Sequence, residues 1–583
     1  MPPAMTYIID SGVPPEARKS RQLTIVAQDP TVRDAAGRIV RARVAVPADW
    51  LGPGPRGQRF HVVDYDATTD VLHPAVDLTD PRADERNRPW TSADRFADAD
   101  DEVLETDPAF HAQNVYAIAA RTLGAFERAL GRRLGWAFAG HQLYLVPHAF
   151  CEANAYYSDD DWGVFFGYLP PIDGKTVYTC LSHDIVAHET THAILDGLRP
   201  RFLEPGLPDQ PAFHEGFADV VALLSVFSVP SLVEAVLGAA DAQGRIDARL
   251  VEEGKLAHSA LFGLAEQFGE ATSGVRGSAL RRSLQLPAND EWRTKLEFEE
   301  PHRRGEVVVA AVMRTLVEIW TGRLRALVYA GGLDRERAAE EGAKSADHVL
   351  QMAIRAIDYA PSVELEFEDF LDALLVADEV VAPDDEHDYR ASVRAAFAAF
   401  GIEQPAGRIV DLARSQERLV YANLNFSALR FDRDEVFRFI WQNAKTLEID
   451  PAYYLRVEAV RPSVRVGPDG LIVNEVVADY VQTLNATAAQ ARELGVTVPA
   501  DVVKDKTEIQ FWGGGTIIFD QFGMARLHES KPLEDWDRQS RRLEFLIRHG
   551  FYDRKKLGFS LETPAGMRFA QFHEPDARAG EAW

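Results

Sequence analysis

The chain has 583 residues, of which 46% are hydrophobic and 26% charged, a composition typical of soluble globular proteins with roughly two to four domains at this length. The net charge of −27 argues against nucleic acid or an anionic membrane as a partner. No apolar run approaches the ~18 residues of a membrane helix. With two cysteines and no signal-peptide pattern, we expect no disulfide framework and a cytoplasmic location.

Short alternating apolar patterns bounded by turn residues dominate the chain ahead of residue 160. One stretch differs, because apolar residues recur at helical spacing from 107 to 134 and predict a long helix. The alternating patterns predict strands, which we place at residues 23–27, 39–46, 60–64, 142–146 and 153–158.

The most informative stretch is His188-Glu189-Thr190-Thr191-His192. Residues four apart on a helix project from one face, so His188 and His192 can hold one tetrahedral zinc ion. Glu189 then lies beside the position that a catalytic zinc ion leaves open, where a carboxylate acts as a general base. The predicted helix begins near Ser182 or Asp184 and ends at Gly197.

A second helix downstream supplies the expected third ligand. It begins at Asp209 or Gln210 and carries Glu215, which we predict as the third zinc ligand. Asp219 is four residues further on the same face. Its carboxylate is placed to accept the spare N–H of His188, which fixes the orientation of a ligand ring. We therefore expect one zinc ion per chain.

Asp184 to Asp196 (DIVAHETTHAILD) resembles the active-site helix of the thermolysin-like neutral metallopeptidases, which are glutamate-liganded zincins. The resemblance extends over roughly residues 60–402. It implies an α+β fold with a β-rich N-terminal lobe, a helical lobe and a zinc cleft between them. The implied activity is hydrolysis of peptide bonds in a protein or peptide substrate by a zinc-activated water, with preference for a hydrophobic residue after the scissile bond. The segments that carry the resemblance outside the motif are 107–132, 154–157, 164–167, 280–281, 302–310 and 349–402.

The same resemblance implies roles for residues outside the zinc motif. His302 matches the histidine that donates a hydrogen bond to the oxyanion, and Glu297 matches the carboxylate that orients it. Asn154 and Ala155 match the edge strand that pairs with the substrate backbone. Arg281 matches the arginine that points into the cleft and supports Glu215.

This sequence departs from the family pattern at three positions. The loop after the zinc helix has Phe202 and Leu203 but no tyrosine to act as second oxyanion donor. Val226 replaces a calcium-binding glutamate, so we expect no principal calcium site. His214 replaces an asparagine ahead of Glu215, which changes the surroundings of His192.

We divide the chain into three parts. Residues 1–183 form the N-terminal lobe, 184–402 the helical lobe with the zinc-site residues, and 403–583 an accessory mixed α/β domain. The sequence assigns no role to this last domain, and recruitment of a substrate or partner is one hypothesis for it. Within the last part we predict helices at 432–447 and 533–549, a hairpin at 464–477, and a strand at 509–519 that Gly513-Gly514-Gly515 interrupts.

Two functional interpretations remain open on the sequence. The first is an active zinc endopeptidase, which the intact Glu189 favours. The second is a catalytically weak zinc-binding interaction module, which the missing tyrosine favours. An aminopeptidase is a lesser alternative, because the glycine-rich motif of those enzymes is not evident ahead of the zinc helix.

Overall fold

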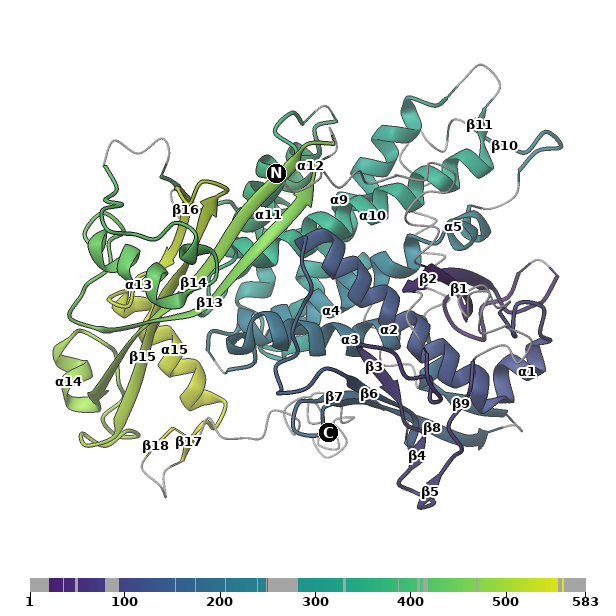
Figure 1. Ribbon diagram of the computed structural model, residues 1–583, viewed down its shortest axis with the longest axis horizontal. Coiled ribbons are helices and arrows are strands. Elements are labelled where there is room, and N and C mark those ends of the chain that lie inside the picture. Colours follow the sequence, from purple (N-terminus) through teal and green to yellow (C-terminus); the bar gives the residue numbers. More distant parts are fainter. Residues whose placement is uncertain are drawn as a thin grey trace, which may run out of the picture.

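Strands with alternating buried residues build much of the N-terminal part, and helices with buried apolar faces build most of the middle of the chain, so the fold is α+β (Figure 1). The structure is a computed structural model. It describes residues 20–34, 36–47, 51–78, 94–152, 154–172, 175–204, 206–237, 240–247, 249, 282–328, 332–385, 387–405, 409–412, 418–467, 470–553 and 558–559.

The N-terminal part contains a β1–β2 hairpin and a five-stranded sheet of order β3-β6-β8-β7, with β9 also on β8. β6 is parallel to β3 and β8, whereas β7 and β9 are antiparallel to β8. β7 is thus an edge strand, as predicted for residues 153–158. The strands are β1 (Ser20–Val26), β2 (Arg41–Pro47), β3 (Phe60–Val62), β4 (Tyr65–Asp66), β5 (Val71–Leu72), β6 (Leu143–Phe150), β7 (Ala155–Ser158), β8 (Gly163–Ile172) and β9 (Lys175–Tyr178).

Helix α2 (Pro108–Leu130) follows the short helix α1 (Asp101–Thr106) and packs against the hairpin, the sheet and the helix of the zinc motif. Asp107 caps it by accepting a hydrogen bond from the Ala109 amide at 2.8 Å. It ends four residues before the predicted limit because Gly131 adopts a left-handed conformation, with φ of 66°.

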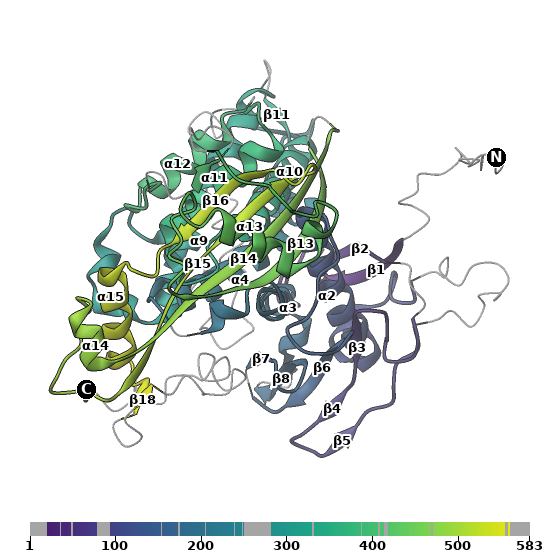
Figure 2. The same cartoon turned by 60° about the vertical axis from the view of Figure 1, so that its left-hand side comes forward.

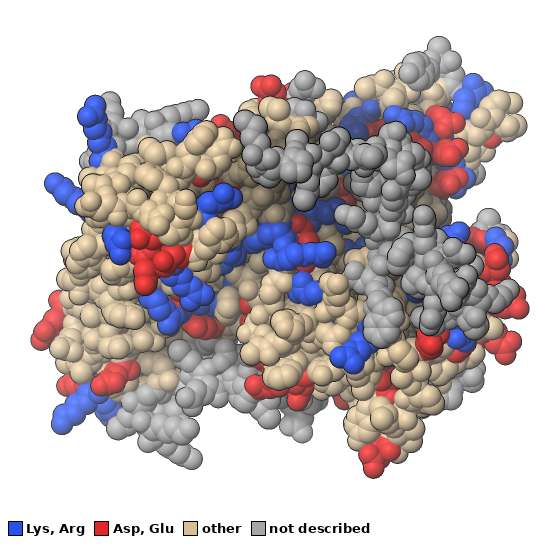
Figure 3. All heavy atoms as spheres, in the orientation of Figure 1, with Lys and Arg blue, Asp and Glu red and all other residues tan. Residues whose placement is uncertain are grey.

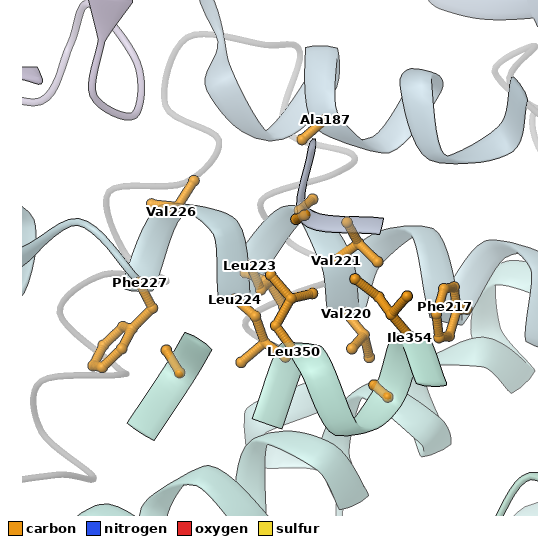
Figure 4. Close-up of a cluster of buried hydrophobic side chains, with 14 of the residues drawn as sticks. Ala187, Phe217, Val220, Val221, Leu223, Leu224, Val226, Phe227, Leu350 and Ile354 are labelled. Atoms are coloured by element: carbon orange, nitrogen blue, oxygen red, sulfur yellow. The ribbon is translucent and has the colours of Figure 1, made fainter. Parts of the chain in front are cut away.

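The helical lobe is organised around α4 (Asp209–Phe227), which is buried along most of its length. Figure 4 shows apolar side chains of α4 between Ala187 of α3 (His183–Leu198) and residues of α10 (Arg335–Tyr359). No described helix is both long and apolar enough to cross a membrane. The turn η2 (Thr179–Leu181) precedes α3. The remaining elements of the helical part are η3 (Pro200–Leu203), α5 (Pro230–Val236), β10 (Arg245–Ile246), η4 (Glu291–Arg293), η5 (Leu296–Glu299), α9 (Pro301–Arg325), β11 (Leu333–Asp334), α11 (Phe367–Val381) and α12 (Tyr389–Ala398).

The C-terminal part contains a second five-stranded sheet, fully antiparallel, in the order β12-β16-β15-β14-β13. The predicted hairpin at 464–477 joins β13 to β14, and helices lie within both predicted ranges. Alternate side chains of β14 face opposite sides, so Val476 packs in a cluster with α13 and Val477 in the main core. Figure 2 shows α13 and the helical lobe on opposite sides of the sheet. The elements are β12 (Ile409–Asp411), η6 (Ala428–Arg430), α13 (Arg433–Gln442), β13 (Tyr454–Val466), β14 (Ile472–Thr487), α14 (Ala488–Glu493), β15 (Glu508–Asp520), β16 (Ala525–Lys531), α15 (Trp536–Arg548), β17 (Tyr552–Asp553) and β18 (Gly558–Phe559).

The three glycines expected to interrupt the strand at 509–519 lie inside β15 instead. Their missing side chains permit close backbone packing. A Cβ on Gly513 would lie 2.5 Å from the Leu533 nitrogen, and one on Gly515 would lie 2.1 Å from the Glu529 carbonyl oxygen. At these positions glycine allows neighbouring backbone segments to pack closely against β15, and it does not interrupt the strand.

Buried ion pairs join this sheet to the helical lobe. Asp358 of α10 contacts both Arg132 and Arg465 of β13, and Asp479 of β14 contacts Arg199 at 2.6 Å. Burial alone would raise the pKa of Asp358, but the two arginines hold it below its usual range. Figure 3 shows basic and acidic side chains interspersed over the visible face.

Candidate metal centre

Helix α3 presents two histidines to the same point, one turn apart. The Nε2 atoms of His188 and His192 are 2.9 Å apart, and the two rings are perpendicular, with centroids 4.5 Å apart. Both side chains are buried. Two neutral imidazoles cannot both present a lone pair at this distance without a proton or another cation between them.

Glu215 of α4 completes this group, which we call the metal centre (His188, His192 and Glu215). Its Oε2 lies 3.4 Å from Nε2 of His188 and 3.5 Å from Nε2 of His192. The three ligand atoms lie within 4.8 Å of one another. Neither carboxylate oxygen of Glu215 has a hydrogen-bond partner of standard geometry among the described residues. The donor set therefore fits a divalent cation, and the residues could hold a metal ion.

Two side chains fix the orientations of the histidine rings. Asp219 lies one turn after Glu215 on α4, and its Oδ1 is 2.8 Å from Nδ1 of His188, as predicted. His214 lies with its Nδ1 2.8 Å from Nδ1 of His192. Burial and the neighbouring His192 hold the pKa of His214 well below its ordinary value, so this ring is neutral and can accept the His192 N–H.

Glu189 and His302 are the two predicted catalytic residues. Glu189 is fully buried on α3, next in sequence to His188. His302 is in the first turn of α9, and its Nε2 lies 3.3 Å from Oε2 of Glu215. Burial lowers the pKa of His302, but Glu215 and Glu300 together raise it above its ordinary value. The structure thus brings His302 to the metal centre from a third helix.

The carboxylate that orients His302 is Glu300, not Glu297. Oε1 of Glu300 lies 2.8 Å from Nδ1 of His302, and the same carboxylate caps α9 by accepting the amides of His302 and Arg303. Glu297 lies in η5, and its Oε1 is 3.9 Å from Arg303. The Glu300-Pro301 pair is a helix-start signal that could have identified the correct residue.

A glycine contact lets α9 approach α4 closely. A Cβ on Gly216 would lie 2.6 Å from the carbonyl oxygen of Gly305, and one on Gly305 would lie 2.7 Å from that of Ala212. Gly216 directly follows Glu215, and Gly305 is three residues after His302. The contact therefore sets the distance between a ligand helix and the helix that carries His302.

Two of the predicted substrate-binding residues, Asn154 and Ala155, lie at the start of the edge strand β7. Asn154 precedes it and accepts the Ala155 amide with its own Oδ1 at 2.8 Å. β7 packs on α3, where the Tyr157 hydroxyl donates to Asp196 at 2.9 Å. Arg281 lies outside the described residues.

Comparison with models of known protein families gives no match, and comparison with curated proteins gives none either. The functional interpretation therefore rests on the chemistry of the metal centre and its neighbours.

Proposed function

We propose that the protein is a zinc-dependent endopeptidase of the thermolysin-like type. The observation that carries the proposal is the convergence of His188, His192 and Glu215. Glu189 is next in sequence to His188, and His302 reaches the metal centre from α9. Two histidines and a carboxylate are a donor set of catalytic zinc sites, which leave one position for water. In this proposal the β-rich N-terminal part and the helical part would be the two lobes of such an enzyme.

The two buried histidines and Glu215 would hold the zinc ion. When bound, zinc would supply a Lewis acid that polarises a peptide carbonyl and lowers the pKa of a water molecule. Asp219 holds the His188 ring through Nδ1 and so leaves Nε2 as the ligand atom. His214 does the same for His192.

The other residues of the site handle protons and charge. Glu189 accepts the proton that water loses as it attacks the peptide carbonyl, and then donates it to the departing amine nitrogen. His302 is held by Glu300 through Nδ1, so its Nε2–H would point toward the metal centre, where it could donate to a developing oxyanion. The substrate backbone would pair with β7, whose outer edge has no strand beside it among the described residues. The cleft would prefer a hydrophobic residue after the scissile bond.

One observation favours the alternative, a catalytically weak zinc-binding interaction module. Phe202, in η3 after the zinc helix, is buried and lies with its ring centroid 6.0 Å from that of Phe213. It has no hydroxyl, so it cannot replace the tyrosine that donates to the oxyanion in the proposed type. Among the residues that the structure describes, His302 is the donor that we assign to the oxyanion.

Cleavage of a denatured protein by wild type and Glu189→Gln separates these functions. We expect equal zinc in both, with cleavage by the wild type alone, because glutamine has the shape of the base but cannot accept the proton. Glu297→Gln, which changes a glutamate outside the metal centre, is the matched control and should keep full activity. Zinc without cleavage in the wild type would favour the interaction module, and absence of zinc would refute both.

A further inference from the structure

A second group of metal-binding side chains lies away from the metal centre. His111 is in the first turn of α2, His148 is near the end of β6, and Cys180 is in the turn η2 ahead of α3. Their ligand atoms lie within 4.8 Å of one another, and all three side chains are at least nine-tenths buried. We call these three residues the thiol cluster.

The contacts of the two histidines require a cation between their inner nitrogens. Nδ1 of His148 lies 2.9 Å from Oδ1 of Asp64, and Nε2 of His111 lies 3.2 Å from the carbonyl oxygen of Glu105. Both outer nitrogens face acceptors, so each needs its hydrogen there. A neutral imidazole has one N–H, and the inner nitrogens, 2.8 Å apart, would then meet lone pair to lone pair.

The metal centre has the same arrangement. Its two inner imidazole nitrogens are 2.9 Å apart, and Asp219 takes the outer nitrogen of one ring as Asp64 does here. A carboxylate behind a ligand histidine is a recurrent feature of metal sites. The recurrence in one chain favours a cation between His111 and His148 and suggests a metal ion in that position.

We propose that His111, His148 and Cys180 bind a second metal ion, a thiophilic ion of the zinc or copper type. Two imidazoles and a thiolate are ligands that both ions prefer. The ion would contact Nδ1 of His111, Nε2 of His148 and Sγ of Cys180. As the metal–sulfur bond forms, the thiol loses its proton to solvent.

The surroundings of the cluster suit a bound cation. All three side chains are buried, so solvent cannot stabilise facing lone pairs there, and a thiolate at Cys180 would need a cation beside it. The ring of Tyr178 covers both histidines, with centroids 4.6 Å and 5.1 Å away.

His148 also belongs to a second group, with Asp64 and His73. Each imidazole nitrogen can coordinate one ion, and Nδ1 of His148 is already within hydrogen-bonding distance of Asp64. We therefore assign the ion to the Nε2 side, where the buried thiol lies. The ion would tie α2, β6 and the turn before α3 together, which gives it a structural role.

Cobalt(II) loaded into the metal-free full-length chain tests the site, because a thiolate ligand gives near-ultraviolet charge-transfer absorption. We expect this band in wild type and in Cys151→Ser, whose exposed cysteine is the matched control, and its loss in Cys180→Ser. Metal content should fall from about two ions per chain to about one in Cys180→Ser. Metal analysis of the purified wild type distinguishes zinc from copper.

The double variant His188→Ala/His192→Ala separates this site from the metal centre. It should keep the charge-transfer band while it loses one ion, whether or not the protein proves to be a peptidase. Absence of the band in folded wild type would overturn the proposal without any variant. Loss of the band in Cys151→Ser, with retention in Cys180→Ser, would overturn it as well.

Discussion

The metal centre and the thiol cluster share an arrangement and differ in what surrounds it. Each has two imidazole nitrogens less than 3 Å apart, at 2.9 and 2.8 Å, with a carboxylate on the far nitrogen of one ring. The metal centre adds a carboxylate ligand and has Glu189 and His302 beside it. The thiol cluster adds a thiol and is covered by the ring of Tyr178. The paired rings favour a bound metal ion in both clusters. The neighbouring residues favour a catalytic role for the ion in the metal centre and a structural role for the ion in the thiol cluster.

Removal of His302 should give the largest change and should affect the metal centre alone. If the protein is the proposed endopeptidase, kcat of His302→Ala should fall by about 10²–10³-fold, because one proposed donor to the oxyanion is lost. Metal content should not change, since His302 is not among the ligands. Unchanged kcat with a raised KM would instead show that His302 binds substrate and does not stabilise the transition state.

Asp219 and Asp64 each contact Nδ1 of one histidine in their cluster, so the same substitution can be compared at both sites. Asp219→Ala should weaken metal binding at the metal centre by about 10–100-fold, and Asp64→Ala should do the same at the thiol cluster. Only the first variant should lower peptidase activity. Competition with a chelator measures both affinities. If Asp64→Ala lowers activity as much as Asp219→Ala does, the two clusters are not independent.

The glycine contact between α4 and α9 belongs to the metal centre and has no counterpart in the thiol cluster. Gly216→Ala places a methyl group 2.6 Å from the Gly305 carbonyl oxygen if the helices stay in place. We expect a loss of about 1–3 kcal/mol in the free energy of unfolding and a lower kcat, because His302 moves with α9. Denaturant unfolding and steady-state kinetics measure the two effects.

Gly322→Ala is the control for this prediction. Gly322 is also on α9, but nothing lies within 4 Å of a Cβ built there. Alanine should therefore stabilise the helix by up to about 1 kcal/mol and leave kcat unchanged. Equal losses in both variants would mean that the close contact does not set the position of α9.

The sequence was most informative where spacing along one helix decides which side chains meet. His188, His192 and the Glu215–Asp219 pair are each four residues apart, so helical geometry places them on one face. Apolar spacing also located α2, although the predicted range ran on to residue 134, past Gly131, where the helix ends. These predictions needed no knowledge of distant contacts.

Contacts between distant segments could not be predicted. His111, His148 and Cys180 come from a helix, a strand and a turn, and no local spacing joins them. The three glycines of β15 predict an interruption when read from the sequence alone, because the residues that pack against them, such as Glu529 and Ser362, come from other elements. The assignment of Glu297 relied on an expected interval, whereas the helix cap placed Glu300 beside His302.

Asp196, near the C-terminal end of α3, should give the smallest effect. Burial raises its pKa from 3.8 to about 7, Asp159 adds to this, and the Tyr157 hydroxyl opposes it. A raised carboxyl pKa stabilises the fold below the unfolded value, and this contribution is lost as pH rises toward 7. Between pH 6 and 8 the free energy of unfolding should fall by roughly 1 kcal/mol from this group. Asp196→Asn should remove that part of the slope without changing metal content, and an unaltered slope would mean that Asp196 is ionised in the fold throughout this range.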